Sequence, residues 1–206
     1  MKNCKSLTLC CVFALLAMGS VGDAIADNIL VNSDFETGDL TGWQVVGGNA
    51  NATGTIQTPD NGPALPGMYN VFMNNQGEAI GLTLKQTTPA GGAVGGLISY
   101  AFDLKLDQAD VGGVLFVEIF AEASGIGIVG GSGLMGPFWP WGAWNTFSGT
   151  FTAPANTDFY TFQIMANTGA AIGTNCVAHV DNVILDVPGV VSAEMSSMGA
   201  VKALFR

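Results

Sequence analysis

The chain has 206 residues, of which 49% are apolar and 11% charged, and its 16 acidic and 6 basic residues give a net charge of −10. This length fits one domain. The high apolar content and low charge content exclude a chain that is intrinsically disordered through excess charge. The negative surface repels phosphate backbones, so we expect no nucleic-acid partner. With His179 as the single histidine, most histidine-based metal sites and most catalytic triads are excluded.

The first 26 residues have the pattern of a secretory signal peptide. Two lysines precede the apolar run Leu7–Met18, and the small-residue motif Ala24-Ile25-Ala26 follows it. The run is shorter than the roughly 20 residues of a membrane-spanning helix. We therefore expect cleavage after Ala26 and a mature chain that is secreted, extracellular or at the cell surface, with no transmembrane segment.

Cleavage would leave one cysteine in the mature chain. Cys4, Cys10 and Cys11 belong to the signal peptide, and only Cys176 remains. No internal disulfide is then possible. Because Cys176 opens an apolar run, we predict that it is buried, while pairing with a second chain stays open.

Residues 27–187 alternate between short β-prone runs and turns rich in Gly, Asn, Asp and Pro. Several runs place apolar side chains at every second position, as expected for a sheet with one buried face. The predicted strands are 28–32, 43–46, 53–57, 69–73, 80–85, 97–104, 113–122, 144–151, 158–166 and 176–186. Gly130–Gly133, at the end of the Gly-rich stretch Ser124–Gly133, reads as a flexible loop. We expect an all-β antiparallel β-sandwich.

The two-residue period of a strand is absent over residues 188–206, which we interpret as a linker and a C-terminal tail. Met195, Met198, Val201 and Phe205 fall near helical spacing. A short amphipathic helix is one interpretation, and a frayed tail is the other, because so short a helix is marginal alone.

Four segments together resemble carbohydrate-binding-module-like, galactose-binding-type jelly rolls of exported bacterial proteins. They are the opening block Asn28–Trp43 with its N-x-x-F-E turn, the strand Ile98–Phe102, the strand and turn Trp144–Pro154, and the closing strand Val180–Leu185. The resemblance implies a jelly-roll sandwich over residues 27–187. Asn182 departs from the family pattern, which often has a second aspartate there.

The resemblance also implies a structural calcium ion. Its ligands would be Glu36 of the F-E turn and Asp181 of the closing strand, with Asp34 as a third candidate. In a regular strand Asp181 would share a face with Val183 and Leu185, and a buried carboxylate needs a cation or several donors. The alternative is that Asp181 accepts backbone hydrogen bonds and that no metal is present.

Two tryptophans are candidates for ligand binding. Trp139 and Trp141 lie between prolines and glycines in a predicted loop. Exposed indoles offer flat apolar faces on which sugar rings can stack. The alternative is that the prolines fold the loop back, so that both indoles cap the sandwich. Trp43 and Trp144 are predicted to belong to the core. Asn74, Asn75 and Gln76 are possible partners for sugar hydroxyls.

No catalytic arrangement is evident, so we expect no enzyme. The G-x-S-x-G motif is absent. Glu118 and Glu122, four residues apart in a strand, would lie about 13 Å apart, beyond the roughly 5–9.5 Å used by glycosidases. The favoured function is a secreted, non-catalytic, glycan-binding sandwich with a structural calcium ion and a poly- or oligosaccharide partner. The alternative is a structural or adhesive surface protein of the same fold that binds no sugar. The oligomeric state stays open.

Overall fold

The computed structural model describes residues 27–48, 53–57, 67–76, 81–110, 112–168 and 173–189. The predicted signal peptide and the predicted helix or tail after residue 189 lie outside this part. All regular elements in the described part are β-strands. They are β1 (Asp27–Asn28), β2 (Gln44–Gly47), β3 (Thr53–Gln57), β4 (Asn70–Gln76), β5 (Gly81–Thr87), β6 (Gly96–Ala109), β7 (Val114–Ala123), β8 (Gly127–Gly131), β9 (Met135–Phe138), β10 (Asn145–Ala153), β11 (Phe159–Asn167) and β12 (Asn175–Val187).

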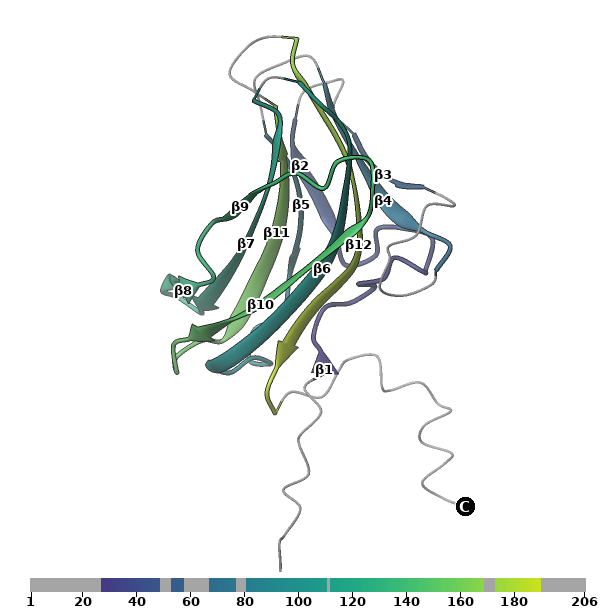
Figure 1. Cartoon of the computed structure of the whole chain (residues 1–206). Coiled ribbons are helices and arrows are strands. Elements are labelled where there is room, and N and C mark those ends of the chain that lie inside the picture. The colour runs from purple at the N-terminus through teal and green to yellow at the C-terminus, as the bar shows by residue number, and fades with distance from the viewer. Residues whose placement is uncertain are drawn as a thin grey trace, which may run out of the picture.

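The strands form two antiparallel sheets that pack face to face (Figure 1). Sheet A has the order β10-β6-β12-β4-β3, and β1 pairs with β12. Sheet B has the order β2-β5-β11-β7-β8, and β9 pairs with β7 on the same side as β8. The predicted all-β jelly-roll sandwich is thus confirmed. The described part contains no helix with the length and hydropathy that a membrane span requires.

The core follows the alternation that the sequence predicts. In sheet B the inward side chains of β7 and β11 are fully buried, and those of β6 meet them from sheet A. Phe102 and Phe162 join the two sheets edge to face, with ring centroids 6.0 Å apart. Because both inner faces supply large apolar side chains at every second position, the two sheets exclude water between them.

A β-bulge interrupts β12, the central strand of sheet A. Asn182 has a φ of 48°, and the pairing of β12 with β6 shifts between Asp181 and Ile184. Val180 before the bulge and Val183 after it are both fully buried. The bulge therefore moves the alternation by one residue. The prediction that Asp181 shares a face with Val183 is wrong, because Asp181 lies on the outer face of sheet A, paired with Asp103.

The N-terminal segment differs from the predicted strand 28–32. Only Asp27–Asn28 forms a strand, β1, which pairs with the last two residues of β12. The chain then turns through two left-handed residues, Asn32 with a φ of 47° and Phe35 with a φ of 58°. The first and last strands of the sandwich nevertheless lie side by side.

Asn28 ties this segment to β12 through its side chain. Its Oδ1 accepts the backbone N–H of Leu185 at 2.9 Å, and its Nδ2 donates to the carbonyl of Val183 at 2.9 Å. The N–H of Val183 donates to the carbonyl of Ser33 at 2.8 Å. The N-terminal segment thereby satisfies the backbone groups that the bulge removes from the regular ladder.

The Gly-rich stretch Ser124–Gly133, for which no strand is predicted, contains β8, and β9 follows it. The predicted flexible loop, Gly130–Gly133, begins inside β8. Gly127 and Gly131 have φ values of 95° and 154°, and a bulge shifts the pairing of β7 with β8. Side chains at Gly131 would come within 2.2 Å of the carbonyl of Ile119. Glycine is needed for this close approach, and a glycine-rich strand carries no alternating pattern that a sequence could reveal.

Cys176 is fully buried, as predicted, and burial raises the pKa of its thiol to about 12. Thiols react as thiolates, and at pH 8 almost none of this thiol is ionised. We therefore predict that iodoacetamide does not modify Cys176 in the folded protein but does so after denaturation, as measured by peptide mass spectrometry. Labelling of the native chain, or a disulfide-linked dimer through Cys176, would contradict this.

Candidate functional site

A short connection carries the two candidate tryptophans from sheet B to sheet A. This Trp connection, residues 139–142, follows β9 and leads toward β10. The Trp139 and Trp141 side chains are 58% and 60% exposed, whereas Pro140 between them is buried. Both indoles therefore lie on the surface and do not cap the sandwich.

Backbone hydrogen bonds fix the Trp connection along β6. The N–H of Leu106 donates to the carbonyl of Pro140, and the N–H of Gly142 donates to the carbonyl of Leu106, both at 2.9 Å. Trp141 also donates its N–H to the carbonyl of Trp139 at 2.9 Å. Gly142 adopts a φ of 68°, which glycine accepts at little cost. The two indoles are thus presented by a segment with an ordered backbone.

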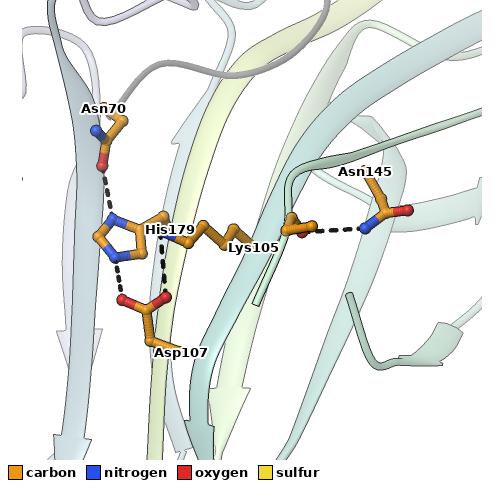
Figure 2. Close-up of polar contacts among 6 residues, drawn as sticks. Asn70, Lys105, Asp107, Asn145 and His179 are labelled. Carbon is orange, nitrogen blue, oxygen red and sulfur yellow. Dashed lines mark hydrogen bonds and ion pairs between the residues drawn. The ribbon is translucent and has the colours of Figure 1, made fainter. Parts of the chain in front are cut away.

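The neighbours of Leu106 in β6 belong to a polar network on the outer face of sheet A (Figure 2). The His179 ring contacts the Asp107 carboxylate through Nε2 at 2.7 Å and the Asn70 amide oxygen through Nδ1 at 2.8 Å. Lys105 Nζ lies 3.3 Å from the second carboxylate oxygen of Asp107. These contacts orient the Asp107 side chain, which is 39% exposed, whereas that of His179 is 3% exposed.

Aromatic rings cover His179 on two sides. The centroid of its ring lies 5.1 Å from that of Phe72 and 5.9 Å from that of Trp144. Trp144, predicted in the core, instead lies half-buried on the outer face of sheet A, because its position is in phase with the outward side chains of β10. Trp43 is in the core as predicted, 6% exposed and packed against Phe35.

The structure thus brings exposed indoles and charged hydrogen-bonding groups to one part of β6. Lys105 supplies a donor and Asp107 an acceptor next to the residue that holds the Trp connection. Sequence reasoning missed both, because only the fold places residues 139–142 beside β6. Of the amides considered as hydroxyl partners, Asn75 is buried between the sheets and donates to the carbonyl of Ala166.

The carboxylates proposed for calcium contact protein donors. Glu36 Oε1 accepts the backbone N–H groups of Met68 at 2.7 Å and Tyr69 at 3.0 Å. Asp34 Oδ1 accepts the N–H of Glu36 at 3.2 Å. The F-E turn therefore holds the chain that enters β4.

Asp181 Oδ1 accepts the N–H of Asn182 at 2.7 Å. Opposite it, Asp103 accepts the Asn182 amide at 2.8 Å and the Thr146 hydroxyl at 2.5 Å. Nowhere in the described part do three side chains of the His, Cys, Asp and Glu types gather closely enough to hold a metal ion. The described contacts of Glu36, Asp34 and Asp181 are with protein donors, and calcium stays a prediction from the sequence.

The acids of β7 have structural partners on the outer face of sheet B. Gln163 Nε2 donates to Glu118 at 3.4 Å, and the Thr161 hydroxyl donates to Glu122 at 2.5 Å. Both pairs join β7 to β11, which are neighbours in the sheet. These contacts give both carboxylates a role in the pairing of the two strands.

No protein-family model matches the sequence, and no curated protein matches it. Solved structures match the fold. The xylan-binding module CBM22-1 of Paenibacillus barcinonensis Xyn10C has a TM-score of 0.53 at 13% identity, covering 81% of this chain and 98% of that one. TmCBM61, solved with β-1,4-galactotriose, has a TM-score of 0.52 at 16% identity, covering 78% and 98%. The fold is the jelly-roll β-sandwich of carbohydrate-binding modules.

A larger protein shares this carbohydrate-binding-module-like fold. The enzymatically active domain of bacteriophage CBA120 tailspike protein 4 has a TM-score of 0.61 at 15% identity. The match covers 78% of this chain but 21% of the tailspike chain. At such identities the likeness concerns the fold, which hosts different functions.

The calcium prediction has a direct test in thermal unfolding. An ion held by Glu36 and Asp181 in the folded chain alone would raise the unfolding midpoint when calcium is added, and a chelator would lower it again. Magnesium at the same concentration is the control for ionic strength. Equal unfolding midpoints with chelator and with calcium would contradict the calcium prediction and leave Glu36 with the role of a hydrogen-bond acceptor.

Proposed function

We propose that this protein is an exported, non-catalytic glycan-binding protein whose ligand stacks on Trp139 and Trp141. The observation that carries the proposal is the exposure of both indoles, 58% and 60%, on a connection that backbone hydrogen bonds fix to β6. Isolated exposed apolar residues are ordinary. Two indoles one residue apart on an ordered backbone form a rigid surface of large area, with little side-chain entropy to lose on binding.

The polar groups beside the Trp connection suit sugar hydroxyls. A hydroxyl both donates and accepts, so it can pair with the Asp107 carboxylate and the Lys105 ammonium. His179 and Asn70 hold Asp107 in place from the buried side. A poly- or oligosaccharide would thus find apolar faces and oriented hydrogen-bonding groups along the same strand, the usual composition of a small-molecule site.

The same contacts support a non-catalytic role. Both ring nitrogens of His179 are engaged, by Asn70 and Asp107, and the side chain is 3% exposed. A histidine held in this way has no free nitrogen to accept a proton from a nucleophile. Glu118 and Glu122 each contact β11 instead of facing one another.

The second candidate function is a structural or adhesive protein of the same fold that binds no sugar. β10, the edge strand of sheet A in the described part, has no charged side chain and favours this function, since such an edge can pair with another chain. Sugar binding and assembly make different demands on Trp139 and Trp141, so substitution of these residues separates the two.

We predict that Trp139→Ala combined with Trp141→Ala abolishes retention on a glycan array. Loss of the stacking area should weaken binding by about tenfold or more, equivalent to about 1.4 kcal/mol or more. Val46→Ala combined with Met68→Ala, which also removes two exposed apolar side chains, is the matched control and should bind as the parent does. Retention of the double tryptophan variant at the parent's level would contradict the proposal and favour the structural role.

A further inference from the structure

One long segment on one side of the sandwich carries no charge. Between Glu122 and Asp158 the sequence contains no Asp, Glu, Lys, Arg or His, although the whole chain has a net charge of −10. This segment forms β8, β9, the Trp connection and β10, which Figure 1 shows on the same side of the molecule. Gly130 of β8 lies against Pro154, directly after β10, so the edges of the two sheets meet there. We call the surface that this segment, residues 123–157, contributes the uncharged side. Lys105 and Asp107 of β6 border it at the Trp connection.

The uncharged side also carries most of the large exposed apolar side chains in the described part. They are Ile126, Ile128, Leu134, Trp139 and Trp141, each between 58% and 72% exposed. A surface that combines absence of charge with exposed apolar groups is typical of an interaction site.

β10 gives this side an open sheet edge. It is the last strand of sheet A, with β6 as its one neighbour in the described sheet. Its nine residues contain no charge and no proline, and the ladder with β6 runs from Asn145 to Ala153 without a register shift. Natural edge strands usually carry lysines, prolines or bulges that prevent pairing with another chain. β10 has none of these protections.

The opposite side of the sandwich differs in the length of its sheet A edge. Its edge strands, β2 and β3, have four and five residues. A Cβ at Gly54 of β3 would lie 2.7 Å from the Val45 side chain of β2, so the two edges pack against each other. Short edges of this kind offer little length for pairing, which leaves β10 as the long open edge of sheet A.

We propose that β10 pairs antiparallel with β10 of a second copy, so that sheet A continues across a symmetric dimer. An antiparallel pair of identical strands is self-complementary about a two-fold axis, whereas a different partner would need its own open edge. Charge favours the same arrangement. Two chains of net charge −10 repel each other, and the uncharged side lets them approach with the fewest like charges in contact.

The test compares two pairs of substitutions by light scattering after size exclusion. Ser148→Glu with Thr150→Glu adds two carboxylates to β10, at exposed outward positions that a second copy would oppose with the same charges. Thr53→Glu with Thr55→Glu adds the same charge at exposed positions of β3, the other edge of sheet A. The measurement is made at a protein concentration on the order of 100 μM, where a micromolar Kd gives mostly complex. The parent protein and the β3 variant should then have the mass of a dimer, and the β10 variant should have the mass of a monomer.

Hydrogen exchange supplies a second readout and controls for folding. Amides of β10 should lose protection on dilution to the monomer, whereas amides of β6 and β12 should keep theirs. A monomeric parent protein at the highest concentration would overturn the proposal. The proposal would also be overturned if the β10 variant formed a dimer with the same Kd as the parent protein while its β6 amides remained protected from exchange.

Discussion

The pairing of β12 with β6 on one side and with β4 and β1 on the other is the constraint from which the rest of the structure follows. On one side β12 runs beside β6 along most of its length, and on the other it pairs with β4 up to Val180. Beyond the bulge at Asn182, β4 no longer reaches it, and the N-terminal segment takes its place. The Asn28 carboxamide makes this exchange possible by bonding the carbonyl of Val183 and the N–H of Leu185. Without it, polar backbone groups at the centre of a sheet would be buried without partners, at a cost of about 1–3 kcal/mol each.

The position of β12 also determines what the outer face of sheet A can do. Because β12 lies between β4 and β6, His179 reaches Asn70 on one neighbour and Asp107 on the other. That network orients a half-exposed carboxylate beside Leu106, the residue that holds the Trp connection. The proposed glycan surface is thus a consequence of strand order. Its polar groups and its indoles come from parts of the chain that only the closed sandwich brings together.

The sequence predicted what depends on local alternation. Buried positions in β6, β7 and β11 follow the two-residue period of a strand, so residues such as Phe102 and Phe162 could be assigned to the core. The bulge at Asn182 could not be predicted in this way, because one left-handed residue reverses the phase of all those that follow, and Asp181 was placed on the wrong face. β8 was missed because glycine carries no side-chain pattern.

The candidate site shows the same division. The sequence singles out Trp139 and Trp141 through their setting among prolines and glycines, but it leaves exposure and capping both open, and the structure shows both indoles exposed. Their charged neighbours Lys105 and Asp107 lie more than thirty residues away in the chain and depend on a crossing between sheets. The Glu36 carboxylate was predicted to hold an ion, and in the structure it holds two backbone N–H groups before β4. A motif can identify a carboxylate as important to a turn without identifying what it binds.

The most direct measurement of the central constraint is the equilibrium unfolding of Asn28→Ala in urea. This substitution removes the two side-chain hydrogen bonds of Asn28 to β12, and it should lower the free energy of unfolding by about 2–3 kcal/mol. Asn145→Ala, which removes a single hydrogen bond to the carbonyl of Ala143 at the surface, is the matched control and should change it by about 0.5 kcal/mol or less. Equal stability of the two variants would show that β12 does not depend on Asn28 and would contradict this account of the fold.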